Sequence, residues 1–481
     1  YETTDFTIFS NARERTVRRR IEEFKIIKDF SEVIFPFSAP AFERTPLRIF
    51  IFDSRRDFND LISQSNVAGF FVNGLVSPFM MIGPRSQETV LYHEYTHYLM
   101  SYGSQTLYPT WYSEGLAEIM STLSVKFSEI SFGAVPDRYL ILQQLGPTSS
   151  ERLLNDSYVT GPLFANQYYA TSWALAKLLI FSDDSDLDAW FNSYLNVYQS
   201  GERDFEQLTT ALGLPVNRID TLLNSAIRSP RGSPLESVIE VKAEDISDGV
   251  ANITVTDMPD SEFAAELFSF YLEQRDYEKI IKSTDSLATD NTKLVDAFYS
   301  ISQYIKTGEP SEMLENLVIN EYCNEQANST AQSKNSRLLS IASDYFFRKG
   351  EIEDSSQFAA CAIELDDRNY EALYQLGKIS LLNRDNKEFY QTLASLVRVN
   401  GLNGNVVQLS FIAGVLLKDE ALINGSTARW RSIFKHSENY PEYDMEYLIY
   451  QHIESMLFPL ILFLPYCNKV IYKYLLLKVN C

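Results

Sequence analysis

His93-Glu94-Tyr95-Thr96-His97 contains two of the four histidines of this 481-residue chain, with a glutamate directly after the first. Gly83-Pro84 predicts a turn upstream, and Ser86 predicts the N-cap of a helix that carries both histidines. Residues four apart on a helix lie one above the other, about 5–6 Å apart at Cβ, so two imidazoles can reach one ion. The spacing predicts a catalytic zinc site with Glu94 beside the metal, whereas a packed or solvated histidine pair is the alternative.

The two faces of this predicted helix differ in composition. One face carries Val90, His93, Glu94 and His97, and the other is apolar and aromatic. We expect the apolar face to pack into a core and the histidines to face a cleft. The residues of the apolar face are Leu91, Tyr95, Tyr98, Leu99 and Tyr102.

Two further acidic candidates occur in the string Trp111-Tyr112-Ser113-Glu114-Gly115-Leu116-Ala117-Glu118, on a second apparent helix. A catalytic zinc ion usually has three protein ligands and one open position. Glu114 suits the third ligand, and Glu118 suits a carboxylate that accepts the free N–H of a ligand imidazole. Two solvated helix carboxylates are the alternative.

Together, the two strings resemble the gluzincin metallopeptidases, and most closely the peptidase MA-like group. The resemblance extends to a strand at 46–52 and to the Gly69-Phe70-Phe71 segment, and it covers about residues 1–230. It implies a fold of the α+β class in which a small mixed sheet and helices carry the zinc site.

The resemblance also implies roles for individual residues. One Zn²⁺ ion would be held by His93, His97 and Glu114, with Glu94 as the general base. Glu118 matches an acidic position beside the ligands, and it stays open as the third ligand because the gap after His97 is shorter than in the aminopeptidases. The Trp-x-x-Glu-Gly alignment favours Glu114.

A tyrosine is the remaining catalytic candidate. Tyr169, in Gln167-Tyr168-Tyr169-Ala170, aligns with a Tyr-x-Lys-Gly string of the alanyl aminopeptidases. A phenol at this place would donate a hydrogen bond to a developing oxyanion. One more core aromatic is the alternative in a chain with 29 tyrosines.

These residues predict a zinc-dependent peptidase, favoured as an endopeptidase, that hydrolyses peptide bonds of a peptide or protein substrate by metal-activated water. Residues 76–82 predict a strand just before the zinc helix, and Pro78 suits a sheet edge to which an extended peptide could add. A second hypothesis is a scaffold or binding protein with a vestigial or non-proteolytic zinc site. A zinc hydrolase of non-peptide amides is a third.

Composition excludes several classes of function. A net charge of −22 argues against nucleic-acid binding, which needs a basic surface. The most apolar stretch, 456–467, contains two prolines and is too short for a membrane span. The four cysteines form no C-x-x-C pair, so no disulfide framework is expected. The sequence contains no evidence of compartment, and the resemblance alone favours a bacterial periplasmic or secreted location.

Changes of pattern divide the chain. Residues 1–228 form the predicted peptidase domain, and Ser229-Pro230-Arg231-Gly232-Ser233-Pro234 predicts a linker. That linker, 229–260, includes an alternating stretch that predicts short strands. Residues 261–430 predict an all-α helical-repeat domain, and 431–481 are unassigned.

The repeat prediction depends on recurring helix-turn strings. The turn positions Arg275, Gly308, Gly350 and Arg384 have spacings near the 34 residues of tetratricopeptide repeats. Such helix pairs bury their apolar faces by stacking into an array with a concave surface, which we expect to bind a protein partner. A plain helical bundle is the alternative.

Overall fold

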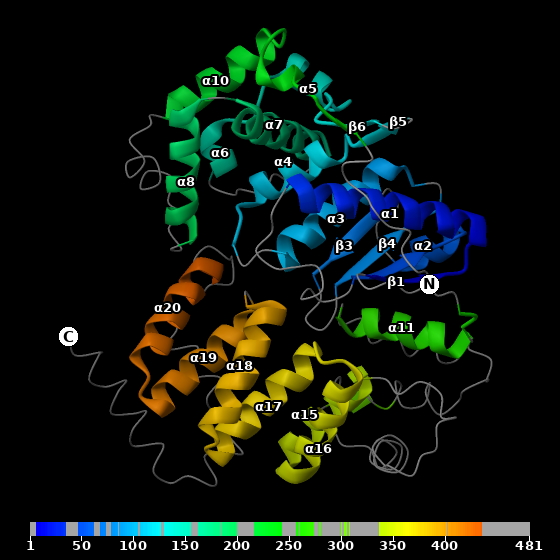
Figure 1. Cartoon of the computed structure of the whole chain (residues 1–481), viewed down its shortest axis with the longest axis vertical. Helices are drawn as coiled ribbons and strands as arrows, with labels where there is room; N and C mark the ends of the chain where they lie inside the picture. The colour runs from blue at the N-terminus through cyan, green and yellow to red at the C-terminus, as the bar shows by residue number, and fades with distance from the viewer. Residues whose placement is uncertain are drawn as a thin grey trace. The chain divides into compact units, whose positions relative to one another are not determined.

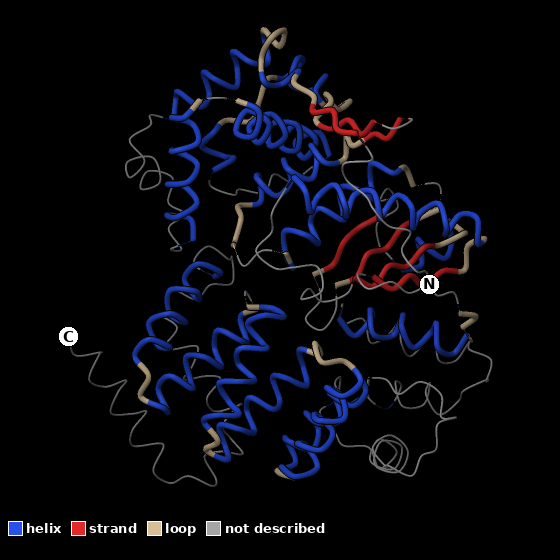
Figure 2. Tube along the Cα trace, viewed as in Figure 1, coloured by secondary structure: helices blue, strands red, loops and turns tan. Residues whose placement is uncertain are grey.

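The computed structural model describes most of the chain (Figure 1, Figure 2). Contacts divide it mainly into an N-terminal unit, Tyr1–Asn73 with Phe79–Thr254, and a C-terminal unit, Val255–Trp430. No helix among the described residues is long and apolar enough to cross a membrane. The described residues are 6–34, 47–61, 68–73, 78–84, 86–103, 106–126, 129–154, 162–182, 184–199, 216–242, 256–258, 260–273, 279, 300, 303–304, 307, 336–401 and 403–434.

The N-terminal unit is built on a four-stranded mixed sheet in the order β1-β2-β4-β3. Three strands are parallel, namely β1 (Phe6–Ser10), β2 (Leu47–Ile51) and β4 (Phe79–Ile82). Parallel neighbours need crossover connections, and α1 (Glu14–Ile34) and α2 (Arg55–Leu61) lie between the strands in sequence. A small mixed sheet followed by helices agrees with the predicted α+β class at this coarse level.

The fourth strand, β3 (Gly69–Val72), runs antiparallel to β4 and forms one edge of the sheet. The prediction that 76–82 forms the edge was therefore wrong for β4, whose residues pair on both sides. All four side chains of β4 are buried, which is typical of an interior strand. Pro78 immediately precedes β4 and is compatible with the start of an interior strand.

The helix with the two histidines is α3 (Glu88–Tyr102), which packs against α1 and β3. Its predicted apolar face is buried, and Tyr95 meets Phe24 of α1 with ring centroids 5.8 Å apart. Residues of the other face, including His93, Glu94 and His97, are only half-buried. The helix therefore turns its histidine face away from the core, as its composition predicts.

The start of α3 is fixed differently from the prediction. Gln87 is the N-cap, and the hydroxyl of Ser86 donates instead to the carbonyls of Gly83 and Ala68. The buried guanidinium of Arg20 donates to the Ser86 carbonyl and pairs with Glu23 at 2.5 Å. These contacts join the first turn of α3 to α1 and to the segment before β3.

The helix with the two glutamates is α4 (Thr110–Met120), and it crosses α7 (Pro162–Phe181) at very short range. A Cβ at Gly115 would lie 2.3 Å from the Ser172 carbonyl oxygen and 2.7 Å from the Ala176 Cβ. Only glycine fits this contact without displacing a backbone. The glycine after Glu114 therefore has a packing function.

The other described elements of this unit surround α7. A three-stranded antiparallel sheet has the order β5-β6-β7, and short helices lie beside it. The buried Lys177 of α7 donates to the carbonyls of Leu235 and Gly133, which ties both segments to the helix. The elements are β5 (Ser124–Lys126), β6 (Glu129–Phe132), α5 (Tyr139–Leu145), α6 (Ser150–Leu154), α8 (Ser185–Gln199), α10 (Val216–Arg228), η2 (Pro234–Glu236) and β7 (Ile239–Lys242).

The predicted linker at 229–260 begins inside the N-terminal unit. Its Pro- and Gly-rich string forms a turn and η2, and β7 follows and pairs with β6. Proline and glycine mark a change of chain direction, which occurs within domains as well as between them. The unit therefore includes the described residues up to Lys242.

The C-terminal unit contains α11 (Asp260–Glu273) and three consecutive helix pairs. Residues with positive φ occur between the helices of each pair at Gly350, Arg384 and Lys418, at intervals of 34 residues. The predicted turns at Arg275 and Gly308 lie outside the described residues. The helices are α15 (Ser336–Lys349), α16 (Ile352–Leu365), α17 (Tyr370–Asn383), α18 (Asn386–Asn400), α19 (Gly404–Leu417) and α20 (Glu420–Phe434).

Asparagines at equivalent places link one helix pair to the next. Asn369 and Asn403 cap α17 and α19 by accepting from backbone N–H groups. Asn369 also donates to Ser336 at 2.7 Å, and the Tyr370 hydroxyl donates to Asn403 at 2.9 Å. The described helix pairs thus recur at one interval and are joined at equivalent positions.

Replacing Gly115 by alanine tests the close contact between α4 and α7. We expect Gly115→Ala to destabilise the N-terminal unit by about 2 kcal/mol, because the added methyl group meets backbone atoms that cannot move aside. Gly425→Ala is the control, since its Cβ would meet nothing within 4 Å and alanine favours a helix by about 1 kcal/mol. Thermal and urea unfolding would measure both variants, and equal stability of Gly115→Ala and wild type would contradict the packing argument.

Candidate metal centre

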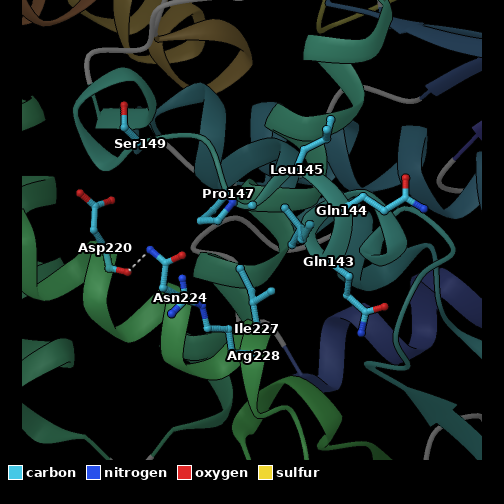
Figure 3. Close-up of a pocket in the computed structure, with 11 residues that line it drawn as sticks. Gln143, Gln144, Leu145, Pro147, Ser149, Asp220, Asn224, Ile227 and Arg228 are labelled. Carbon is cyan, nitrogen blue, oxygen red and sulfur yellow. Dashed lines mark hydrogen bonds between the residues drawn. The ribbon is translucent and has the colours of Figure 1, made fainter.

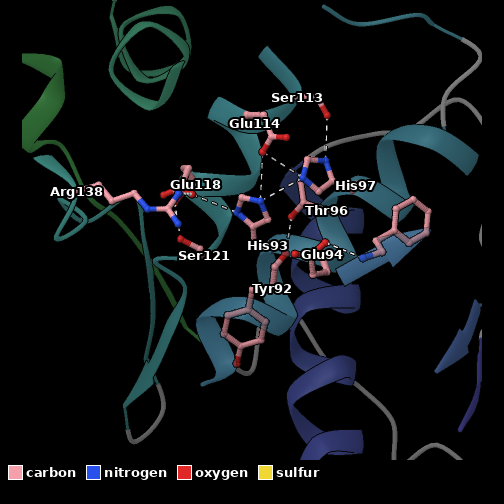
Figure 4. Close-up of polar contacts among 11 residues, drawn as sticks. Tyr92, His93, Glu94, Thr96, His97, Ser113, Glu114, Glu118, Ser121 and Arg138 are labelled. Carbon is pink, nitrogen blue, oxygen red and sulfur yellow. Dashed lines mark hydrogen bonds and ion pairs between the residues drawn. The ribbon is translucent and has the colours of Figure 1, made fainter. Parts of the chain in front are cut away.

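Helices α3 and α4 bring three candidate ligand atoms together (Figure 4). The Nε2 atoms of His93 and His97 lie 3.2 Å apart. An Oε2 atom of Glu114 lies 3.3 Å from the first and 3.4 Å from the second. The three atoms form a nearly equilateral triangle, which is the arrangement of three ligands on one face of a metal ion.

The Oε2 atom of Glu114 is buried against the two imidazoles. Among the described residues it has no further donor beside the Nε2 atoms of His93 and His97. Burial raises the pKa of Glu114, but contacts with His93 and His97 outweigh burial and lower it to about 2. A buried, ionised oxygen needs a positive partner, which a protonated imidazole or a cation can supply.

The outward nitrogen of each imidazole has its own polar neighbour. The Nδ1 atom of His97 lies 3.1 Å from the Ser113 hydroxyl, and Nδ1 of His93 lies 3.5 Å from Oε1 of Glu118. If each Nδ1 carries the proton, each Nε2 presents a lone pair to the centre of the triangle. Glu118, whose carboxylate accepts and does not donate, favours this tautomer of His93, and the Ser113 hydroxyl can accept from His97 in the same way.

Glu94 lies on the same helix face as the imidazoles and is held by the sheet edge. Its Oε2 atom accepts a hydrogen bond of 2.9 Å from the backbone N–H of Phe71 in β3. Burial raises the pKa of Glu94 above its ordinary value, although the imidazoles and the Phe71 N–H act in the opposite direction. A carboxylate with a raised pKa is a better proton acceptor than an ordinary glutamate.

Tyr169 lies outside the immediate ligand cluster. The half-buried ring contacts the guanidinium of Arg138, whose Cζ atom is 5.0 Å from the ring centroid. Arg138 also donates to Glu118, so Tyr169 is connected to the cluster through two side chains.

The structure thus gathers five of the six predicted site residues and connects the sixth at longer range. Three groups were not predicted, namely the Ser113 hydroxyl, the Phe71 N–H and the Arg138 guanidinium. Ser113 directly precedes the predicted ligand Glu114, and Phe71 belongs to the Gly69-Phe70-Phe71 segment, so the sequence offered a weak indication of both. Arg138 is 20 positions from Glu118, and no sequence pattern pointed to it.

A separate hollow of about 820 Å³ is lined by α5, the segment between α5 and α6, and α10 (Figure 3). Its wall includes Gln143, Asp220, Asn224 and Arg228, and none of the predicted site residues lines it. The carboxylate of Asp220 accepts from the N–H and hydroxyl of Ser150 at 2.9 and 2.6 Å, so it caps α6.

Comparisons with protein-family models, with curated proteins and with solved structures find no match to this chain.

Removing any of the three candidate ligands should abolish metal binding. Wild-type protein should bind one divalent ion per chain, whereas His93→Ala, His97→Ala and Glu114→Ala should each weaken binding by at least about 100-fold, since two ligands remain. His436→Ala, which changes a histidine far away in sequence, is the control. Equilibrium dialysis with metal analysis measures the stoichiometry, and full binding by His97→Ala would show that the cluster is not the site.

Metal binding should also weaken as the pH falls. Burial lowers the pKa of His93, but the Glu114 hydrogen bond and the charges of Glu94 and Glu118 outweigh it and raise the pKa above 6.5. Protons therefore compete with the ion already above pH 6.5. In metal-free protein the raised pKa of His93 instead makes the fold more stable at low pH. The His93–Glu114 ion pair stabilises the fold while His93 is protonated, and this stabilisation is lost as the pH rises through the raised pKa.

Two titrations separate these effects. The metal dissociation constant should rise from about pH 8 to about pH 5.5. The stability difference between metal-free wild type and Glu114→Gln should be larger at about pH 5.5 than at about pH 8. A metal affinity independent of pH over this range would contradict ligation by imidazole.

Proposed function

We propose that this protein is a zinc-dependent peptidase whose metal is held by His93, His97 and Glu114 and whose general base is Glu94. The observation that carries the proposal is the triangle of two Nε2 atoms and one carboxylate oxygen, with sides of 3.2, 3.3 and 3.4 Å. A glutamate that could act as a base adjoins it on the same helix. Structural zinc sites, in contrast, are usually closed by four protein ligands.

The donor set and the spacing support zinc as the metal. A tetrahedral ion with bonds of about 2.0–2.1 Å separates its ligand atoms by about 3.3–3.4 Å, close to the sides of the triangle. Two imidazoles favour transition metals over calcium and magnesium, which prefer oxygen ligands. The buried Oε2 atom of Glu114, which has no donor besides the two imidazoles among the described residues, has the place and charge of a third ligand.

Bound zinc would supply Lewis-acid chemistry, polarising a carbonyl and lowering the pKa of water to about 7. The protein's own residues would then handle the proton. The Phe71 N–H holds one oxygen of Glu94, which fixes the carboxylate beside the cluster. Glu94 would accept a proton during attack on the carbonyl and pass it to the leaving amine.

The edge strand β3 supports a peptide as the substrate. The N–H and C=O of one residue in an antiparallel strand point to the same side. Because the Phe71 N–H points to Glu94, its carbonyl also points away from β4. An extended peptide could therefore add beside β3 next to the general base, with the Phe71 carbonyl as an acceptor. This proposal transfers the predicted substrate strand from β4 to β3.

Replacing Glu94 by glutamine should separate metal binding from hydrolysis. Glu94→Gln keeps the size of the side chain and a hydrogen-bond acceptor for Phe71 but cannot take up a proton. We expect zinc content equal to wild type and a loss of peptide cleavage of at least about 100-fold. Glu88→Gln, at an exposed position of the same helix, should keep both properties. An unbiased peptide-library digest measures cleavage, and undiminished turnover by Glu94→Gln would remove the mechanism.

A second candidate function is peptide binding by the helical array, with a metal site that is vestigial or not proteolytic. Two nearly fully buried glutamines on the first helices of successive pairs carry polar atoms without hydrogen-bond partners among the described residues. These atoms are Oε1 of Gln375 in α17 and Nε2 of Gln408 in α19. One accepts and the other donates, as the backbone of an extended peptide requires. Because both atoms are enclosed, a peptide would contact them only if the side chains that cover them move aside when it binds.

Replacing Gln408 by methionine tests this second candidate. A buried amide without a partner destabilises the fold, so Gln408→Met should leave stability unchanged or increase it by about 1 kcal/mol. If the amide binds a peptide, the same change should weaken binding by about 5- to 10-fold. A peptide array probed with the Glu94→Gln protein, with and without Gln408→Met, measures this. Lost stability together with unchanged binding would assign Gln408 to the core alone.

A further inference from the structure

We infer that Arg138 is a positioning residue of the metal centre, which orients the ligand His93 through Glu118 and holds Tyr169 beside the cluster. The inference rests on the proposed function for its effect on turnover, but its effect on the metal stands on the candidate ligands alone. Arg138 directly precedes α5, far in sequence from α3. Its guanidinium contacts Glu118, the partner of the candidate ligand His93, and the ring of Tyr169, the candidate catalytic phenol.

The first contact of Arg138 is with a buried carboxylate. Glu118 is only 5% exposed, and its Oε1 atom accepts from Arg138 and lies 3.5 Å from Nδ1 of His93. A buried carboxylate without a cation is strongly disfavoured, so an unpaired Glu118 would turn toward solvent. It would then no longer orient the His93 ring. Arg138 therefore keeps Glu118 in the place that His93 needs.

The second contact of Arg138 uses a different part of the same group. The Cζ atom lies 5.0 Å from the centroid of the Tyr169 ring, which is within the range of a cation–π contact. A planar guanidinium presents N–H groups along its edge and a flat surface on its face. Arg138 can thus bond Glu118 with its edge while its face packs on Tyr169. A lysine ammonium group has no flat face, so it cannot bond Glu118 and pack on the Tyr169 ring equally well.

The position of Arg138 is consistent with this dual role. Figure 4 shows Glu118 and Arg138 on the outer side of His93, with Ser113 beyond His97. The side chain of Arg138 remains 40% exposed, so the cation keeps solvation while its partner Glu118 is enclosed. Each ligand imidazole thus has one outer partner. The partner of His93 is the charged Glu118, which pairs with Arg138, whereas the partner of His97 is the neutral Ser113.

The two contacts predict separable effects of two substitutions. Arg138→Gln removes the charge from Glu118 and the flat cation from Tyr169. Arg138→Lys restores a charge for Glu118 but not the planar stack on Tyr169. We therefore expect metal affinity to recover in the lysine variant and turnover to recover only in part.

The experiment uses the full chain and three measurements. Zinc affinity is measured by competition with a chromophoric chelator, the ligand field by the visible spectrum of the cobalt-substituted protein, and turnover by kcat and KM on a peptide cleaved by wild type. Arg138→Gln should bind zinc about 10-fold more weakly, shift the cobalt spectrum and lower kcat more than it changes KM. Arg138→Lys should restore zinc affinity and the cobalt spectrum while kcat stays reduced. Arg152→Gln, an exposed arginine of α6, is the control and should match wild type.

Several results would overturn the inference. An Arg138→Gln protein with wild-type zinc affinity and cobalt spectrum would exclude a role through Glu118, and full recovery of kcat by Arg138→Lys would exclude the contact with Tyr169. If Arg138→Gln does not fold, the zinc affinities of Glu118→Gln, Arg138→Lys and the double variant test the inference instead. Coupled residues give non-additive effects on zinc affinity, whereas independent residues give additive ones. Wild type that binds zinc but cleaves no peptide would reject the proposed function, while the zinc and cobalt measurements would still accept or reject Arg138.

Discussion

A buried carboxylate facing two imidazoles is the constraint on which the candidate centre depends. Leaving an ion such as Glu114 unpaired in the interior costs several kcal/mol or more, so helices α3 and α4 can approach only if positive charge lies between them. Two imidazoles meet this need through protonation or through a bound cation. Because both solutions use the same Nε2 atoms, protons and a metal ion would compete at this cluster.

The surrounding structure serves to hold this arrangement in place. Gly115 lets α4 approach α7, Arg20 secures the start of α3, and the Phe71 N–H of the sheet edge holds Glu94. Each contact joins the centre to a different part of the N-terminal unit, so the ligands stand on helices that are themselves supported by packing. Such support is what a catalytic centre needs, since small displacements of its groups cost much of the rate.

Much of this could be read from local patterns. The i, i+4 histidines, the apolar face of α3 and the glutamate pair on α4 follow from helix geometry, which depends only on neighbours in sequence. In the C-terminal unit the 34-residue interval from Gly350 to Arg384 was visible, and the structure adds Lys418. Arginine and lysine are both rare at positive φ, so residue type alone does not mark the turns at Arg384 and Lys418. The sheet edge was misassigned because strand order is a long-range property.

The sequence by itself determined which residues of α3 share a face, which of them are basic or acidic, and that two helices carry the candidate ligands. Only the tertiary structure decided that Glu114 faces both Nε2 atoms while Glu118 faces Nδ1, that β3 supplies the N–H for Glu94, and that Arg138 reaches Glu118. The reason is physical, because helix periodicity sets directions within one helix, whereas distances between helices are set by side-chain packing such as that at Gly115.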